Sequence, residues 1–373
     1  MNKIDGRLVS ALSVEDSAYA LVRVRSRWHY GCVARRFDVA AEFPFINSVG
    51  IRCNRAEVER LAHMREVEFV TAQGRVSALD TAEETDASLS EITAGMSADV
   101  SDAAAEIFSS GRLTGEGVNL CVMDTGIAPH SDLSIPRDRI VGFADLIGGR
   151  EFPYDDNGHG TFVAGVAAGN GLLSGGKIEG AAPCAGLVGV KVISASGETG
   201  TFKILEGMQW LYDRFRELNI KVVCMSFGAD PVASADPLKL GAEMLTRSGL
   251  TVVCAAGNSG VGGLKSPGIS SEVITVGAVD DGLNVAEFSS SGVYQGVYRP
   301  DIYAPGVKVR GVDAGGTYSV MSGTSVSAPY IAGACCLLHQ KYRRLAPRDV
   351  KRMLIAASVN VRGARVFRLP DKD

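Results

Sequence analysis

The sequence contains no apolar run as long as the roughly 18–20 residues that a membrane-spanning helix requires. It also lacks the long apolar stretch of a secretory signal near its start, because charged residues recur there through Glu15 and Asp16. A net charge of −4 over 373 residues gives no indication of binding to a nucleic acid or an anionic membrane. These absences favour a cytoplasmic protein, and secretion directed by a signal outside this sequence is the alternative.

The eight cysteines lack the regular spacing of a disulfide framework, and no pair of CxxC motifs indicates a zinc site. Cys121, Cys224 and Cys254 lie inside apolar strand-like runs, and Cys335 and Cys336 are adjacent in a later apolar run. Cysteines in such positions serve as small buried side chains. The pattern therefore predicts free thiols and a reducing compartment.

A small-residue segment at 322–329 surrounds Ser325, and the apolar run Tyr330–Leu338 follows it directly. This pattern predicts a serine at the start of a buried helix. Unpaired N–H groups at a helix start favour a negative charge that forms beside the hydroxyl. Such a serine is suited to attack a carbonyl group, although a plain helix N-cap would also explain the pattern.

Two further motifs supply the groups that such a serine needs. Asp124 ends the apolar run 118–123 and precedes a turn at Gly126. His159, one of five histidines, stands between two glycines and opens another apolar run. A hydroxyl needs a base to take its proton, and the base needs a carboxylate to fix its tautomer. The chain order Asp, His, Ser is the order found in subtilisin, whereas chymotrypsin and the α/β-hydrolases have other orders.

Four motifs together resemble those of the subtilisin-like serine proteases, the subtilases, over residues 111–357. They are Asp124-Thr125-Gly126, His159-Gly160-Thr161, Ala255-Ala256-Gly257-Asn258 and Gly323-Thr324-Ser325. The resemblance implies a serine endopeptidase that forms an acyl-enzyme on Ser325, with Asp124 and His159 as the other catalytic residues and Asn258 as an oxyanion donor. Segments 177–192, 266–281 and 299–306 most resemble a bacterial subgroup thought to work inside the cell.

The same resemblance implies where substrate binds. One wall of the first specificity pocket, with the cleft edge beside it, matches Ser226, Phe227 and Gly228. The opposite wall of this pocket matches Ala255, Ala256 and Gly257. The other edge of the cleft includes Gly197 and Gly200. Extended peptides pair with such edges through backbone hydrogen bonds. The pocket floor is expected near residues 263–267, where Lys265 is either a partner for acidic side chains or an ordinary surface charge.

Residues 112–373 alternate between strand-like and helical patterns. Strands are expected at 119–123, 186–192, 221–225, 250–254 and 273–276, and helices at 160–168, 202–216, 234–247, 325–345 and 347–357. This alternation predicts an α/β fold with a mostly parallel sheet and helices on both faces. In such folds the functional groups gather at the carboxyl ends of the strands.

Residues 1–79 form a different unit, predicted as a small α+β domain. Strands are expected at 19–24, 44–51 and 67–70, and Asn54 is expected to cap a helix through His63. This unit resembles the propeptide of subtilases, which acts as a folding chaperone and an intramolecular inhibitor. A structural domain that is never removed is the alternative.

Residues 80–111 carry eight acidic residues and no Lys or Arg, which predicts a solvated linker running into a helix near 102–108. If the chain cleaves itself, we expect the cut after Ala78 or Leu79.

The expected substrates are proteins or peptides, and no cofactor is expected for catalysis. Asp132 matches a calcium-ligand position of the family, but one carboxylate does not make a site for an ion that takes six to eight oxygens, so calcium and any other metal stay unassigned. A catalytically silent subtilase used as a binding or signalling module is the alternative function. A lipase-like esterase is disfavoured because Ser327, and not glycine, stands two positions after Ser325.

Overall fold

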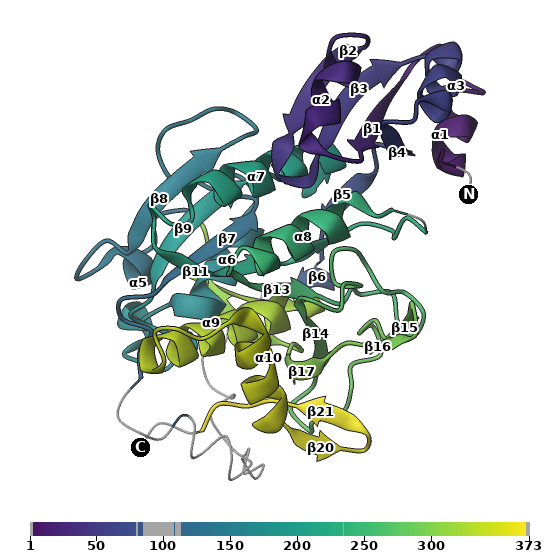
Figure 1. The fold of residues 1–373 in the computed structure, drawn as a ribbon. Helices are drawn as coiled ribbons and strands as arrows, with labels where there is room; N and C mark the ends of the chain where they lie inside the picture. The colour runs from purple at the N-terminus through teal and green to yellow at the C-terminus, as the bar shows by residue number, and fades with distance from the viewer. Residues whose placement is uncertain (1–2, 80, 85–107, 109–112, 234, 371–373) are drawn as a thin grey trace.

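The structure is a computed structural model that describes residues 3–79, 81–84, 108, 113–233 and 235–370 (Figure 1). It contains a large nine-stranded sheet and a separate four-stranded sheet formed by the N-terminal part of the chain. Within these described residues, no helix has the length and apolar character needed to cross a membrane.

The nine-stranded sheet confirms the predicted α/β fold. Its strand order is β20-β21-β17-β14-β13-β11-β7-β9-β8, and all neighbours are parallel except the edge pair β20 and β21. The strands are β7 (Asn119–Asp124), β8 (Ile140–Asp145), β9 (Gly186–Lys191), β11 (Ile220–Met225), β13 (Thr251–Ala255), β14 (Ile274–Val279), β17 (Ile302–Pro305), β20 (Val359–Val361) and β21 (Ala364–Val366). Strands β8, β17, β20 and β21 were not among those expected from the sequence.

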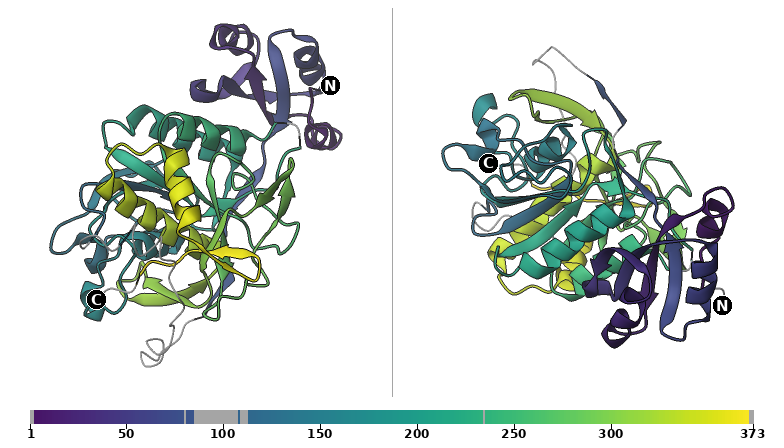
Figure 2. Two further views of the ribbon diagram at one scale, coloured as in Figure 1. Left: turned by 60° about the horizontal axis from the view of Figure 1, so that its bottom comes forward. Right: turned by 90° about the horizontal axis from the view of Figure 1, so that it is seen from above.

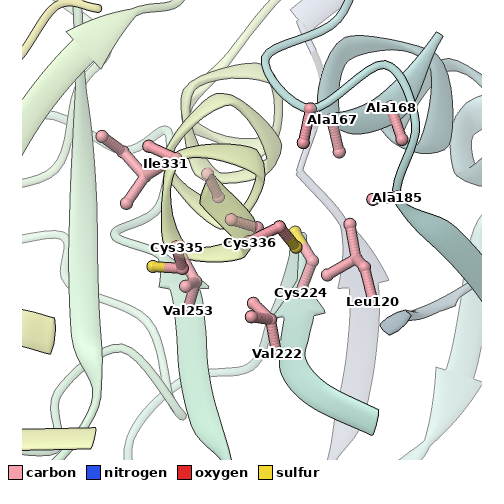
Figure 3. Close-up of a cluster of buried hydrophobic side chains, with 14 of the residues drawn as sticks. Leu120, Ala167, Ala168, Ala185, Val222, Cys224, Val253, Ile331, Cys335 and Cys336 are labelled. Carbon is pink, nitrogen blue, oxygen red and sulfur yellow. The ribbon is translucent and has the colours of Figure 1, made fainter. Parts of the chain in front are cut away.

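Helices cover both faces of this sheet, because alternate strand residues are buried on opposite sides. One face packs against α6 (His159–Ala168), α9 (Thr324–Lys341) and α10 (Pro347–Ala356), and the other against α7 (Thr201–Arg214) and α8 (Pro237–Arg247). In β7, Leu120 and Val122 belong to the α9 side, whereas Cys121 and Met123 belong to the α7 side. Figure 3 shows the α9 side, where Cys335 and Cys336 of α9 lie above the strand residues Val253, Val222 and Cys224.

All eight cysteines are free in the structure, and the five expected inside apolar runs, Cys121, Cys224, Cys254, Cys335 and Cys336, are buried as predicted. Burial raises the pKa of Cys224 to about 12. Because the thiolate is the reactive form, this buried thiol is inert at neutral pH.

The N-terminal unit is an antiparallel sheet with the strand order β2-β3-β1-β4. Its elements are α1 (Gly6–Ala11), β1 (Ala18–Val24), α2 (Arg27–Ala34), β2 (Asp38–Phe43), the 3-10 helix η1 (Pro44–Ile46), β3 (Ser48–Cys53), α3 (Arg55–His63) and β4 (Val67–Ala72). Asn54 caps α3 as predicted, in a capping box with Glu57.

The sequence analysis was wrong on two points in this unit. The segment 44–51, expected as one strand, is divided into η1 and β3 because Asn47 adopts a left-handed conformation with φ 51°. Helix α2 and strand β2 were also missed. Strand β2 has a burial pattern that alternates, but only Phe43 is fully buried, and the half-buried positions are Val39 and the small Ala41, which give a weak apolar signal.

The N-terminal sheet packs against α7 and α8 through aromatic side chains. The ring of Phe202 in α7 lies 5.6 Å from that of Phe43 and 6.2 Å from that of Tyr19, measured between centroids. Gly50 leaves room for the same ring, since an added Cβ would lie 2.6 Å from it. Both views of Figure 2 show this purple unit beside the teal and green helices.

The chain leaves the N-terminal unit as two short strands that pair with strands of the later part of the chain. Strand β5 (Arg75–Ala78) lies between β10 (Glu198–Gly200) and β12 (Phe227–Gly228), and β6 (Thr81–Glu84) pairs with β19 (Tyr318–Ser322). Strand β6 is a departure from the linker expected at 80–111. The helix expected near 102–108 lies outside the described residues except for Phe108. The remaining elements are α5 (Ser131–Ser134), the 3-10 helix η2 (Leu172–Ser174), β15 (Gly292–Tyr294), β16 (Val297–Arg299) and β18 (Val309–Val312).

Candidate active site

The structure brings Asp124 and His159 together at the carboxyl edge of the large sheet. Asp124 is the last residue of β7, and His159 is the first residue of α6. The His159 Nδ1 atom lies 2.7 Å from Asp124 Oδ1, and the side chains are 1% and 0% exposed. Because a carboxylate only accepts hydrogen bonds, Nδ1 carries the proton and Nε2 is the basic nitrogen of the ring.

The glycine after the histidine allows this close approach. An added Cβ on Gly160 would lie 2.2 Å from the carbonyl oxygen of Gly126 and 3.0 Å from Asp124 Cβ. The Gly160 N–H instead donates to Thr125 Oγ1 at 2.9 Å. The Asp-Thr-Gly and His-Gly-Thr motifs are therefore two halves of one contact, which holds α6 against the end of β7.

Asp155 holds the start of α6 in place. Its carboxylate accepts hydrogen bonds from the N–H groups of Asn157, Gly158 and Thr161 at 2.9–3.1 Å. Burial by itself raises the pKa of Asp155, but these hydrogen bonds outweigh it and hold the pKa below its usual value. Asp155 therefore stays ionised beside the positive end of the helix dipole, and it fixes the position of His159.

Ser325 lies in the first turn of the neighbouring helix α9, where its side chain is fully buried. Helices α6 and α9 meet at their first turns, where Phe162 and Val326 belong to one apolar cluster. The Ser325 hydroxyl oxygen makes no hydrogen bond to any residue that the structure describes. The Ser325 carbonyl is anchored by Ser226 Oγ at 2.9 Å.

Asn258 follows β13 and points its amide at the same space. Its Nδ2 atom donates to the carbonyl oxygen of Leu79 at 2.9 Å. Its Oδ1 atom accepts from both the N–H and the hydroxyl of Thr324, at 2.9 and 2.8 Å, which fixes the amide orientation. An added Cβ on Gly323 would lie 2.7 Å from Leu79 O, 2.8 Å from Ser325 Oγ and 3.0 Å from Asn258 Nδ2. These three atoms therefore surround one small space, which glycine leaves open.

Residues 75–79 lie in the cleft as an extended strand. The Ala78 N–H donates to Gly197 O at 3.0 Å, and the Leu79 N–H donates to Ser226 O at 3.2 Å. The expected cleft residues Gly200, Phe227 and Gly228 pair with the same strand in register.

The residues expected to form the opposite wall of the specificity pocket make other contacts than the residues of the two cleft edges. Ala255 and Ala256 make no hydrogen bond to strand 75–79 among the described residues; Ala256 O instead accepts from the N–H of Lys265 at 2.9 Å. The Gly257 N–H donates to Thr324 Oγ1 at 3.1 Å. The residues expected to form this wall therefore do not pair with strand 75–79 in the described part of the chain.

Sequence reasoning missed Lys191, which is fully buried although charged. It is the last residue of β9 and stands beside Asp124 in register. Its ammonium group donates to the carbonyl oxygens of Thr125 and Ile193 and to Asp156 Oδ1, the last at 2.6 Å. It thereby ties together three loops around the Asp124–His159 pair. A lysine that ends an otherwise apolar strand run is the signal that could have found it.

The surroundings of Asp132 do not fit a calcium site. Its Oδ1 accepts from the Leu173 N–H at 2.9 Å, and its Oδ2 accepts from the Tyr318 hydroxyl at 2.6 Å. Both carboxylate oxygens therefore already have donors, which a cation would have to displace. Across the described parts of the chain, no cluster of three or more His, Cys, Asp or Glu side chains is arranged to hold a metal ion.

We expect Asp132 to contribute to no calcium site, so Asp132→Asn should leave any effect of calcium or chelators on the thermal stability unchanged. A bound ion whose free concentration is 100 times its Kd would add about 2.7 kcal/mol to the free energy of unfolding, which raises Tm by several degrees. The measurement is Tm by calorimetry in calcium and in EDTA. A calcium-dependent rise that Asp132→Asn abolishes would contradict the expectation.

Sequence comparison with known proteins identifies one family and several relatives of this chain. The model of the subtilase family matches residues 115–369. The serine protease AprX of Bacillus subtilis is 41% identical over 285 residues, which cover 67% of this chain and 63% of AprX. Subtilisin Savinase of Lederbergia lenta is 40% identical over 61% of this chain and 78% of its own length. Alkaline elastase YaB of Bacillus sp. is 33% identical over 82% of this chain and 72% of its own length.

A solved structure agrees with the sequence comparisons. A cold-adapted subtilisin-like serine proteinase superposes with a TM-score of 0.59 at 27% identity, covering 70% of this chain and 92% of that chain. The chain thus spans less than two thirds of the length of AprX, and nearly all of that solved structure.

Proposed function

The chain belongs to the subtilase family, and from this premise we propose that it is a serine endopeptidase made as a zymogen, with residues 1–79 as its inhibitory propeptide. One observation carries the proposal: the hydrogen bond from Asn258 Nδ2 to the carbonyl oxygen of Leu79. An amide that donates to a peptide carbonyl beside a buried serine hydroxyl is arranged to stabilise an oxyanion.

Leu79 has the contacts expected of a substrate residue immediately before the bond that is cleaved. Its N–H donates to Ser226 O, its carbonyl accepts from Asn258, and its side chain is only 9% exposed. Backbone pairing with β10 and β12 on both sides holds the preceding residues extended. Of the two cleavage positions considered, these contacts support a cut after Leu79 over one after Ala78.

The chain also continues beyond that bond as a bound strand. In β6, Thr81 pairs with Ser322 and Glu84 pairs with Val320. Backbone pairing on both sides of the bond supports an endopeptidase, because such an enzyme binds a polypeptide that passes through its cleft.

The proposed reaction transfers the acyl group to water through Ser325. His159 Nε2 takes the hydroxyl proton as Ser325 Oγ attacks the peptide carbonyl carbon, and Asn258 with the Ser325 N–H stabilises the oxyanion. The carbon–nitrogen bond then breaks as His159 protonates the leaving amine. Water attacks the acyl-enzyme with His159 again as base, while Asp124 keeps the ring oriented and stabilises its cation.

The N-terminal unit supports the inhibitor part of the proposal. It is anchored on α7 through Phe202 and through the Phe45 N–H, which donates to Gln209 Oε1 at 3.1 Å. This anchor holds its C-terminal strand in the cleft, where it excludes other substrates. Proteins and peptides are the proposed substrates, and the predicted cytoplasmic location is to be checked by cell fractionation.

Labelling with a serine-directed fluorophosphonate probe tests the activity. Protein freed of residues 1–79 should label at Ser325 and hydrolyse casein, and protein that retains them should react slowly. Absence of both reactions in the freed protein would favour the alternative of a silent binding module.

The variant Asn258→Ala should lower kcat about 10²–10³-fold with little change in KM, because the amide acts mainly on the oxyanion. This range is the one known for the equivalent loss in a subtilisin and is adopted, not calculated. Steady-state kinetics on a peptide substrate provide the measurement. The matched control is Asn360→Ala on the edge strand β20, which should keep full activity; an Asn258→Ala variant with unchanged kcat would remove the oxyanion role.

A further inference from the structure

The pocket that holds the Leu79 side chain is closed by a lysine. An added Cβ on Gly228 would lie 3.0 Å from Leu79 Cδ1, and the family resemblance places Gly228 and Gly257 on opposite walls of this pocket. The same Cβ would lie 2.6 Å from Lys265 Cβ, and one added on Gly257 would lie 2.7 Å from Lys265 Cγ. The Lys265 stem therefore crosses from one wall to the other, next to the bound leucine.

The position of Lys265 is fixed at both ends. Its backbone N–H donates to Ala256 O at 2.9 Å, which ties the residue to the wall that precedes Asn258. Its ammonium nitrogen lies 2.6 Å from Asp230 Oδ1. The Lys265 side chain is 23% exposed and that of Asp230 is 79% exposed, so the ion pair lies at the solvent side of the pocket.

The ion pair determines which part of the Lys265 side chain is available to contact a substrate. The hydrogen bond from Lys265 lowers the pKa of the Asp230 carboxyl, so the aspartate is charged at neutral pH and balances the ammonium. The methylene groups of Lys265 remain as the surface that faces the pocket. The pocket therefore presents an apolar boundary with no uncompensated positive charge.

We propose that Lys265, held by Asp230, determines the side-chain preference of this protease: the pocket accepts medium-sized aliphatic residues such as leucine and disfavours aromatic and acidic ones. This inference rests on the proposed function. Aromatic rings are excluded because the stem limits the length of the pocket, and acidic side chains are disfavoured because the Lys265 ammonium is already paired with Asp230. The sequence left open whether Lys265 is a partner for acidic side chains or an ordinary surface charge, and its pairing with Asp230 favours the second interpretation.

The test compares hydrolysis of three peptides that differ only in leucine, phenylalanine or glutamate before the cleaved bond. Wild-type protein freed of residues 1–79 should prefer leucine. Lys265→Gly should raise the phenylalanine-to-leucine ratio of kcat/KM about tenfold or more, within the range expected for pocket size changes. Asp230→Asn should raise the glutamate-to-leucine ratio about two- to tenfold at low salt, because it releases the ammonium.

The matched control is Lys265→Met, which keeps the length of the stem without the charge. It should leave the phenylalanine-to-leucine ratio as in wild type and should not gain glutamate cleavage when combined with Asp230→Asn. Ratios measured on one preparation do not depend on the fraction of folded enzyme. Unchanged ratios in Lys265→Gly and Asp230→Asn, with fluorophosphonate labelling intact, would overturn this inference alone. A wild type that neither labels nor cleaves any peptide would overturn the proposed function and the inference together.

Discussion

Replacing Ser325 with alanine is expected to leave residues 1–79 attached and to remove proteolysis. In the proposed reaction the Ser325 hydroxyl is the atom that attacks both the chain's own Leu79 carbonyl and external substrates, so one substitution blocks both events. Loss of the serine in a subtilisin lowers kcat about 10⁶-fold, and we expect a loss of that order here.

Mass spectrometry of the two purified proteins provides the measurement. Wild type should yield a product that begins at Asp80, and Ser325→Ala should remain full length. Ser271→Ala, which changes an exposed serine, is the matched control and should process like wild type. Cleavage of Ser325→Ala at the same junction would mean that another protease makes the cut. An intact Met1 in fully active wild type would contradict the propeptide role.

Replacing Asp124 with asparagine is expected to lower kcat about 10⁴-fold with little change in KM. The carboxylate accepts the proton-bearing Nδ1 of His159 at 2.7 Å, and an amide in its place can donate to the ring and favour the wrong tautomer. The pair is almost completely buried, so water does not take over the role of the lost carboxylate. The magnitude is that known for the equivalent change in a serine protease of another fold.

Steady-state kinetics together with thermal unfolding separate this effect from simple loss of structure. Asp124→Asn keeps the size of the side chain, but Asp124 Oδ1 accepts both from His159 Nδ1 and from the Thr125 N–H, each at 2.7 Å. An amide nitrogen that faces the ring in its place removes the acceptor of the Thr125 N–H, so we expect a modest fall in Tm with the protein still folded at the assay temperature. Asp281→Asn, at an exposed turn, is the control and should retain full kcat. A kcat close to wild type in Asp124→Asn would refute the proposed orienting role.

Much of the catalytic part could be predicted from the sequence, because its signals are local and strong. The helix after Ser325 is apolar on all sides and was expected at 325–345; the structure has it at Thr324–Lys341. The strand before Asp124 was expected to end in a carboxylate at the edge of the sheet, and it does. Buried parallel strands appear as continuous apolar runs, which makes them readable one by one.

The N-terminal unit was harder to predict because its signals are weak. Strand β2 has only Phe43 fully buried, and α2 has only Val33 fully buried, so neither gives a strong periodic pattern. The boundary between η1 and β3 depends on one left-handed residue, Asn47, whose conformation is set by the packing around it. The buried Lys191 was missed for a related reason: its three acceptors come from separate loops that only the fold brings together.

The sequence by itself determined the chemical groups and their order, because each motif combines a reactive side chain with the glycines and apolar runs that its own local structure requires. Only the tertiary structure decided that the Leu79 carbonyl accepts a hydrogen bond from Asn258, and that the Lys265 ammonium is paired with Asp230. Those two contacts join positions 179 and 35 residues apart along the chain. Contacts over such separations depend on how whole layers pack, and no local pattern of residue types encodes them.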